Sequence, residues 1–201
     1  MDIKKFLETL AAGTPTPGGG SASALAGSLS ASLIAMVAEL SIRKAQSQNR
    51  RMREIRKRAL VIQERLFRAI DEDARSFDAV MDAFRLSREG ERDRLYRRRM
   101  IQKAYRKATV TPQKVCESSL LLLEFAEFLL REGNRNALSD TGVAACLAGA
   151  ALEGGILNIR INLGSIKDRA FRRGKDRLIR RLSKKKELLM AAIQKRMQRG
   201  I

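Results

Sequence analysis

Few residues in this chain can interrupt a helix. Only three prolines occur among 201 residues, and two of them stand close together in the segment Thr14-Pro15-Thr16-Pro17. Aromatic residues make up 4% of the chain, which argues against an all-β fold, whereas long stretches of Ala, Leu, Arg, Glu and Lys run without a break. These residue types favour helix. The sequence therefore predicts an all-α, single-domain helical bundle over residues 1–201 that has its own core or completes it by dimerising.

Apolar residues recur at three- and four-residue intervals, which is typical of packed helices. We expect helices at Met1–Ala12, Ala22–Leu40, Arg43 to beyond Phe84, Arg88–Thr109, Val115–Leu130, Gly142–Leu157 and Ala170–Arg199. Two of them carry small residues at helical spacing, which permits close approach of their backbones. These residues are Ala24, Ser28, Ala31 and Ala35 in the first helix and Ala144, Ala148, Ala151 and Gly155 in the second. We expect these two helices to form a central buried pair.

The absence of histidine and the placing of the two cysteines limit the catalytic mechanisms and metal sites that the chain can support. The chain has no histidine, so imidazole bases and Ser-His or Cys-His nucleophile pairs are excluded, and the usual metal ligands are lacking. Cys116 and Cys146 lie in apolar surroundings without the spacing of a metal site, and we interpret both as reduced core residues. Serines and Glu39 interrupt the apolar stretch 22–40, and charges follow Met1 closely. We therefore expect no membrane span or signal peptide, and a cytoplasmic location.

The net charge is +19, from 41 basic and 22 acidic residues. Such a surface attracts nucleic acids and anionic metabolites alike. The basic stretches 43–68, 88–107 and 169–199 are equally consistent with the solvated faces of amphipathic helices. Seven Phe, two Tyr and no Trp leave little for base stacking, and no helix-turn-helix or zinc pattern occurs, so nucleic acid is not the expected partner.

A glycine-rich segment precedes the first small-residue helix. Pro15 and Pro17 stiffen the backbone that leads into the helix. Gly18-Gly19-Gly20 can adopt positive φ and expose backbone amides, and Ser21 can cap the helix. Free N–H groups at a positive helix end suit a carboxylate, a carbonyl-rich ring or a phosphate. The alternative is a turn that only allows close packing.

Two aspartates are candidate functional carboxylates. Asp73 continues an apolar stripe through Phe77, so its carboxylate must be paired, hydrated or partly protonated. The alternative for Asp73 is an edge position paired with an arginine. Ser139 and Asp140 precede the second small-residue helix, and either can act as its N-cap.

Taken in order, Pro15 to Ser21, Asp73-x-x-x-Phe77, Gly133-Asn134, Ser139-Asp140 and Asn158-x-x-x-Asn162-Leu163 resemble the cyclodeaminase/cyclohydrolase family over most of the chain. That family includes the C-terminal domain of formiminotransferase-cyclodeaminase and stand-alone methenyltetrahydrofolate cyclohydrolases. Leu86-Ser87 departs from the Leu-Pro expected there, which puts only the local turn in doubt.

The resemblance implies an all-helical homodimer that acts on a tetrahydrofolate derivative without a cofactor or metal. Members either open the 5,10-methenyl ring with water or expel ammonia from 5-formiminotetrahydrofolate. Both are addition–elimination reactions at one amidine-like carbon, which need a carboxylate for proton transfer and a fixed substrate. We favour the cyclohydrolase, because the chain has no room for a fused formiminotransferase; a cyclodeaminase would need a separate formiminotransferase as partner.

Residue roles follow from the resemblance. Asp140 is the first candidate for the catalytic carboxylate, because pairing of the two small-residue helices would bring it beside the glycine loop, and Asp73 is the second. The expected substrate-binding residues are Pro17, Gly18, Gly19, Gly20, Ser21, Asn134, Ser139 and Asn158. Asn134 and Asn158 can alternatively act as helix caps. Two rival functions are a basic nucleic-acid-binding protein and a folate-binding subunit without catalysis.

Overall fold

The structure, a computed structural model, describes residues 2–45 and 50–200, and these residues form helices and no strand, which confirms the all-α prediction. The helices are α1 (Ile3–Ala11), α2 (Gly19–Ala45), α3 (Arg50–Arg85), α4 (Glu91–Ala108), α5 (Val110–Glu132), the short 3₁₀ helix η1 (Arg135–Ala137), α6 (Leu138–Gly164) and α7 (Arg169–Gly200). Met1 and residues 46–49 of the predicted basic stretch 43–68 lie outside the described residues.

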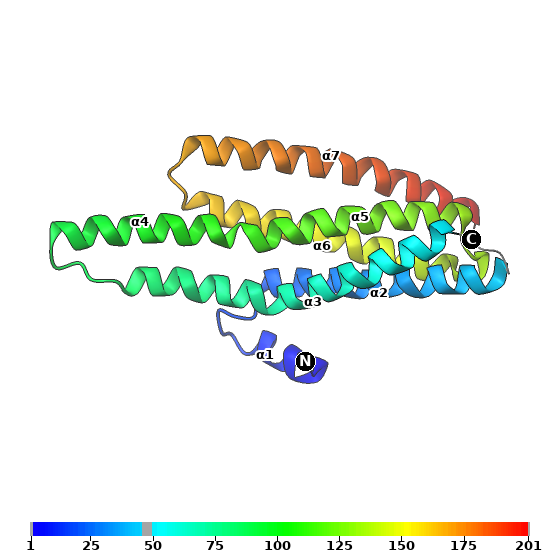
Figure 1. Ribbon diagram of the computed structural model, residues 1–201, viewed down its shortest axis with the longest axis horizontal. Coiled ribbons are helices and arrows are strands. Elements are labelled where there is room, and N and C mark those ends of the chain that lie inside the picture. Colours follow the sequence, from blue (N-terminus) through cyan, green and yellow to red (C-terminus); the bar gives the residue numbers. More distant parts are fainter. Residues whose placement is uncertain (1, 46–49, 201) are drawn as a thin grey trace.

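The small-residue helices α2 and α6 pack against each other and run antiparallel through the bundle (Figure 1). Ser30 Oγ donates a hydrogen bond to the carbonyl of Ala144 at 2.7 Å, where the two backbones approach closely. The predicted small-residue positions on both helices are buried, which confirms the central pair. The pair is nevertheless covered on one side only, since Leu29, Met36 and Leu40 of α2 remain exposed.

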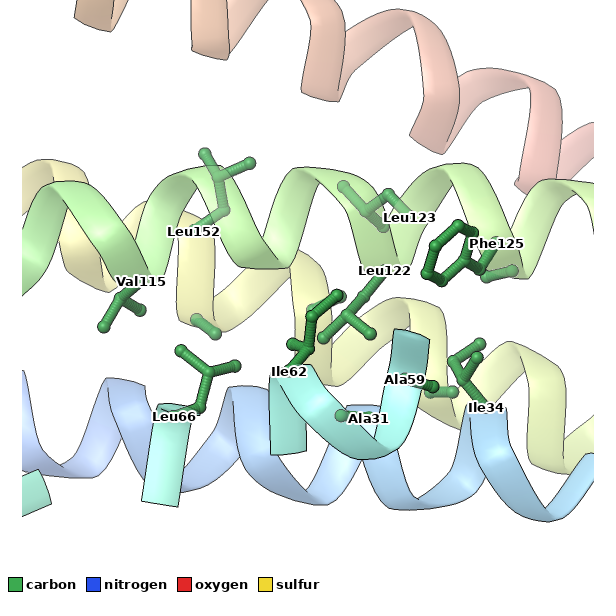
Figure 2. Close-up of a cluster of buried hydrophobic side chains, with 14 of the residues drawn as sticks. Ala31, Ile34, Ala59, Ile62, Leu66, Val115, Leu122, Leu123, Phe125 and Leu152 are labelled. Carbon is green, nitrogen blue, oxygen red and sulfur yellow. The ribbon is translucent and has the colours of Figure 1, made fainter. Parts of the chain in front are cut away.

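Two further helices, α3 and α5, cover the inner side of this pair. Figure 2 shows apolar side chains from α2, α3, α5 and α6 converging in one core. In α3 the apolar residues that recur at three- and four-residue intervals are all buried there, namely Met52, Ile55, Ala59, Ile62, Leu66 and Ala69. Burying each large aliphatic side chain contributes roughly 1.5–3 kcal/mol, so this shared core stabilises the bundle. The outer helix α7 lies against α5 and α6, and α4 continues roughly in line with α5 (Figure 1).

Several predicted boundaries were wrong by a few residues. Helix α2 begins at Gly19 instead of Ala22, so Ser21 lies inside its first turn and is not its N-cap. Helix α5 begins at Val110, which places Pro112 in its first turn, where proline is tolerated because the missing N–H has no intrahelical partner. Cys116 is buried on α5, but Cys146 is exposed on α6, so the interpretation of both cysteines as core residues was half correct.

Positive charge is concentrated on the two outer helices α4 and α7. Together they carry 21 of the 41 basic residues and only 4 of the 22 acidic ones. Most of these basic side chains are exposed, as the solvated-face interpretation predicts. Helix α7 packs its apolar side, including Ile179, Leu182 and Ile193, against the bundle. The remaining helices are therefore close to neutral.

By length and composition alone, the stretches Gly19–Arg43 and Arg135–Gly164 would suffice to cross a membrane. Half of the apolar 18-residue segment within each stretch is buried inside the bundle. Composition is weak support for a membrane span here, because the core helices of bundles meet the same criteria.

Close packing of α5 on α6 depends on Gly155. A Cβ atom at this position would lie 2.5 Å from Cys116 Sγ and 3.0 Å from the carbonyl oxygen of Pro112. We expect Gly155→Ala to lower the free energy of unfolding by about 1–3 kcal/mol, because the helices must separate. Urea denaturation followed by circular dichroism measures this change.

The matched control is Gly149→Ala on the same helix. Its Cβ would meet Met190 Sδ at 3.4 Å, an ordinary contact with a flexible side chain. We expect this variant to be as stable as the wild type or up to about 1 kcal/mol more stable, because alanine favours helix over glycine. Equal stabilities for both variants would contradict the close α5–α6 packing.

Candidate active site

A cleft of about 430 Å³ lies where the glycine loop meets α3, α4 and α6. Its size is within the range of small-molecule sites. The cleft is lined by Pro15, Thr16, Gly18, Gly19, Gly20, Asp73, Ser76, Phe77, Val80, Met81, Tyr105, Ala108, Asn158, Ile161, Asn162 and Ser165. The predicted glycine loop, Asp73 and Asn158, which are far apart in the sequence, are thus brought together. A larger recess among Arg88, Arg94 and Arg98 is lined by charged side chains alone.

Asp73 lies directly on the glycine loop. A Cβ atom built on Gly20 would be 2.3 Å from each carboxylate oxygen of Asp73, so the side chain fills the space that any other residue at position 20 would need. Burial raises the pKa of the Asp73 carboxyl, and the adjacent backbone N–H and hydroxyl of Ser21 partly offset this rise in pKa. Asp73 is not in an ion pair with any residue that the structure describes, so the alternative of an arginine-paired edge position was wrong. A partly buried carboxylate with a raised pKa is suited to proton transfer.

Ser21 positions this carboxylate and does not face the cleft. The residue is fully buried, and its Oγ donates a hydrogen bond of 2.8 Å to the carbonyl of Ile70, one turn before Asp73 on α3. The predicted contact between the Ser21 hydroxyl and a substrate is therefore replaced by a structural role. The hydroxyl and the adjacent backbone N–H fix α3 on the start of α2.

Gly18, Gly19 and Gly20 allow neighbouring groups to approach the backbone closely, and they do not adopt unusual backbone angles. Among the described glycines only Gly13, with φ of 73°, has positive φ, so the prediction of positive φ at Gly18 to Gly20 was wrong. Gly18 and Gly19 line the cleft, as expected. Pro17 does not line it. It follows a cis peptide bond and faces a shallow recess with Phe6 and Ile70 on the α1 side.

Two amides of α6 supply polar groups on the opposite wall. Asn158 Nδ2 donates to the carbonyl of Gly154 at 2.8 Å, and Asn162 Nδ2 donates to the carbonyl of Asn158 at 2.8 Å. These bonds fix both side chains along α6, one turn apart, and Asn158 is not a helix cap. A Cβ atom built on Gly19 would lie 3.9 Å from Asn158 Nδ2, so the glycine segment and this amide are close neighbours.

Aromatic and apolar side chains form the remaining walls, and the sequence analysis missed part of them. Phe77 and Met81 of α3 and Tyr105 of α4 line the cleft. Tyr105 is held edge-on against Phe84, with ring centroids 6.2 Å apart. Nothing in the sequence marks Tyr105, because it lies in a polar, basic helix whose direction relative to α3 is set by the turn after Arg85.

Asp140, Asn134 and Ser139 lie away from this cleft. Because α2 and α6 are antiparallel, the start of α6 lies at the end of α2, and Asp140 is about 27 Å along α6 from Asn158 at 1.5 Å per residue. The two small-residue helices do pair, but the prediction that this pairing brings Asp140 beside the glycine loop was wrong. Asp140 and Ser139 lie in the first turn of α6 without capping it, and Asn134 accepts from the N–H of Asn136, as a cap of η1.

Comparison with known proteins identifies the family. The family model of formiminotransferase-cyclodeaminase matches residues 2–180, which include every element around the cleft. The chain belongs to this family. The match covers most of the chain, and it confirms the family resemblance that the sequence motifs indicated.

Individual relatives fall into two groups. The chain is 34% identical over 171 residues to a methenyltetrahydrofolate cyclohydrolase of Methylorubrum extorquens, an alignment that covers 84% of this chain and 82% of that protein. It is 29% identical over 172 residues to formimidoyltransferase-cyclodeaminase of Mus musculus, covering 85% of this chain and 32% of that longer protein.

A solved structure shows the same fold. The crystal structure of formiminotetrahydrofolate cyclodeaminase from Thermotoga maritima matches with a TM-score of 0.89 and 26% identity, over 98% of this chain and 96% of that one.

Proposed function

We propose that this protein is an enzyme of folate one-carbon metabolism, a 5,10-methenyltetrahydrofolate cyclohydrolase. The observation that carries the proposal is the partly buried Asp73 carboxylate held on Gly20 within a cleft lined by apolar, aromatic and amide side chains. The 34% identity to a methenyltetrahydrofolate cyclohydrolase of similar length supports the choice of reaction.

The proposed reaction opens the ring at the methenyl carbon, a cationic centre bonded to two folate nitrogens. Asp73 accepts a proton from water as the water oxygen forms a bond to this carbon. The same carboxyl then returns the proton to one nitrogen as the carbon–nitrogen bond breaks, and the remaining hydroxyl proton is released to solvent. A formyl group is left on the other nitrogen. The negative charge of Asp73 also stabilises the cationic carbon before attack.

The other cleft residues hold the substrate. Phe77, Met81 and Tyr105 offer apolar and aromatic surface to the planar ring system, and Asn158 and Asn162 offer amides to its polar edge. Beyond the cleft, the basic helices α4 and α7 attract the anionic glutamate end of the substrate. That the reaction needs no cofactor stays a prediction, and so do the cytoplasmic location and the lack of nucleic acid as a partner.

A second candidate function is 5-formiminotetrahydrofolate cyclodeaminase. It is supported by the match to the Thermotoga maritima cyclodeaminase over nearly the whole of both chains. The two reactions share the methenyl species, and Asp73 can transfer the proton in either. In the cyclodeaminase case a separate formiminotransferase would supply the substrate.

The protein is further proposed to act as a homodimer. The support is the exposed apolar side of α2 and α6, where Leu29, Met36, Val143, Leu157 and Ile161 are 40–74% exposed. Scattered apolar residues are ordinary on a surface, but a continuous row on two adjacent helices indicates an interface.

A spectrophotometric assay tests the function. Purified protein is mixed with 5,10-methenyltetrahydrofolate and, separately, with 5-formiminotetrahydrofolate, while methenyl absorbance and released ammonia are followed. Loss of methenyl absorbance above the spontaneous rate is expected, whereas ammonia release would support the cyclodeaminase. Binding without turnover would contradict both and favour a folate-binding subunit.

The pH profile of this turnover should report Asp73. Activity requires the carboxylate form, so it falls as pH decreases through the raised pKa of Asp73, at a higher pH than for an ordinary aspartate. Ser21→Ala removes the Ser21 hydroxyl, one of the two polar groups that lower the pKa of Asp73, and the acidic limb should therefore move to higher pH. Ser118→Ala, a buried serine on α5 outside the cleft, is the control. An unmoved limb in Ser21→Ala would contradict the assignment of Asp73.

A further inference from the structure

Helix α1 is attached to the bundle through one side chain. Figure 1 shows α1 below the other helices, at the end of the segment that leads into α2. Phe6 is the one buried residue of α1, with 8% of its surface exposed, whereas Ile3 and Leu7 are more than half exposed. An amphipathic helix of nine residues is marginal on its own, so Phe6 decides whether α1 stays docked.

Phe6 lines a recess of about 270 Å³ beneath α1, which we call the α1 recess. The residues that line it from the rest of the chain are Pro17, Ile70, Asp71 and Ala74. Pro17 directly precedes the glycines, and the other three belong to the part of α3 that carries Asp73. The anchor of α1 therefore lies against both segments that form the Asp73 site.

The α1 recess and the cleft share these two segments as walls. In the first segment, Gly18 to Gly20 line the cleft and Pro17 lines the recess. In α3, Asp73 lines the cleft, whereas Ile70 and Ala74 line the recess. The two segments therefore separate Phe6 from the cleft, so that Phe6 supports the carboxylate site from behind.

A hydrogen bond ties the two segments together within this wall. Ser21 Oγ donates to the carbonyl of Ile70 at 2.8 Å, and both residues are buried. Phe6 lies beside Ile70 in the α1 recess and is buried with it in the same apolar cluster. Loss of the Phe6 ring would leave this junction open to water on the recess side, where water competes for the carbonyl of Ile70.

The connection between α1 and the glycines is short and constrained. Gly13, with φ of 73°, follows the end of α1, and Thr14 Oγ donates to the carbonyl of Thr16 at 3.0 Å. Pro15 and Pro17 restrict the backbone further. A displacement of α1 is therefore passed on to the glycines, because no flexible linker absorbs it.

We propose that Phe6 is a positioning residue, which docks α1 in its recess, holds Gly20 against α3 and so keeps the Asp73 carboxylate in place. Phe6 lies outside the cleft lining and takes no part in the chemistry. The proposal rests on the proposed folate function for its kinetic test, whereas its structural test needs no enzyme activity.

Phe6→Ala should lower kcat/KM for 5,10-methenyltetrahydrofolate by about 10- to 100-fold, because a small displacement of a catalytic group costs up to about 10²-fold. Phe6→Leu refills most of the recess and should restore most of the activity. Leu7→Ala is the matched control, since Leu7 is exposed on the same helix, and it should keep wild-type kinetics. Wild-type kinetics in Phe6→Ala, or equal losses in Phe6→Ala and Leu7→Ala, would overturn the proposal.

A double variant determines whether Phe6 acts through Asp73. If it does, adding Phe6→Ala to Asp73→Asn should lower kcat/KM no further, since residues that act as a unit are not additive. A general loss of active protein would instead multiply with the loss that Asp73→Asn causes. Multiplied losses would therefore contradict a role through the carboxylate.

Hydrogen–deuterium exchange tests the docking without enzyme activity. In the first turn of α2 the amide of Ala22 donates to the carbonyl of Gly18 at 3.0 Å. In Phe6→Ala the amides from Gly18 to Ser23 should exchange at least about tenfold faster than in the wild type and in Leu7→Ala, because this segment opens locally. Amides in the middle of α6 should keep their wild-type rates.

The outcomes of this exchange experiment separate the positioning from the folate function. Wild-type exchange at the glycines would overturn the proposal, and so would unfolding of the whole bundle in Phe6→Ala, because Phe6 would then be an ordinary core residue. Faster exchange confined to the glycine segment, in a protein whose wild type does not turn over folate, would mean that the folate function is wrong while the positioning by Phe6 is correct.

Discussion

Asp73→Asn should lower turnover at least about a hundredfold while the bundle stays folded. The substitution keeps the shape of the side chain on Gly20 but removes the group that accepts a proton from water. General base catalysis contributes typically 10²–10⁴-fold, so we expect kcat for 5,10-methenyltetrahydrofolate to fall by about that factor. Steady-state kinetics measures this fall, and helicity by circular dichroism verifies the fold.

The same variant should be more stable than the wild type at neutral pH. Burial raises the pKa of Asp73, which means that the folded state binds a proton more tightly than the unfolded state does. Stability from this group is fully present below the unfolded pKa and is lost as pH rises through the folded pKa. An asparagine has no charge to desolvate, so Tm should rise at pH 7, and the difference should close as pH decreases.

Asp78→Asn is the matched control for both measurements. Asp78 is an exposed carboxylate on the same helix, about one turn beyond Asp73 and outside the cleft lining. We expect wild-type kcat and nearly wild-type Tm for this variant. If Asp73→Asn turned over substrate as fast as Asp78→Asn, Asp73 would not be the proton-transfer group.

The sequence was sufficient for the helices and for their central pair. Breakers are rare, so long periodic segments could be assigned directly, and the small residues of α2 and α6 identified the helices that approach most closely. Asp73 was recognisable because a carboxylate on an apolar stripe needs a special environment. These features are local, and the period of the helix decides them.

The direction of α6 relative to α2 was not available from local patterns. Close packing of small residues is equally feasible for parallel and antiparallel helices, so the pairing gave no reason to separate Asp140 from the glycine loop. The same limit applies to Tyr105, which reaches the cleft through the turn between α3 and α4. Ser21 was predicted to bind substrate because its actual partner could not be foreseen. The hydrogen bond from Ser21 to Ile70 joins residues that are 49 positions apart in the sequence.

Gly20→Ala should reduce activity as severely as loss of Asp73. The new Cβ would lie 2.3 Å from both carboxylate oxygens and 2.4 Å from Cγ, so the carboxylate must leave its place or α2 must move. Because a small displacement of a catalytic group costs about 10²-fold, we expect at least that loss in kcat/KM. Overpacking should also lower the free energy of unfolding by about 1–3 kcal/mol.

The control is Gly174→Ala on α7, where a Cβ would meet nothing within 4 Å. It should retain wild-type kinetics, with a small gain in stability from helix propensity. Retention of activity in Gly20→Ala would show that Asp73 does not work from its position on the loop.

A double variant distinguishes a shared cause from two separate ones. If Gly20 acts only by making room for Asp73, then Asp73→Asn combined with Gly20→Ala should be no slower than the slower single variant, since residues that act as a unit are not additive. Multiplied losses would mean that Gly20 also contacts the substrate, as a cleft-lining residue can. The kcat/KM values of the four proteins therefore tell whether the glycine loop serves the carboxylate alone or the substrate as well.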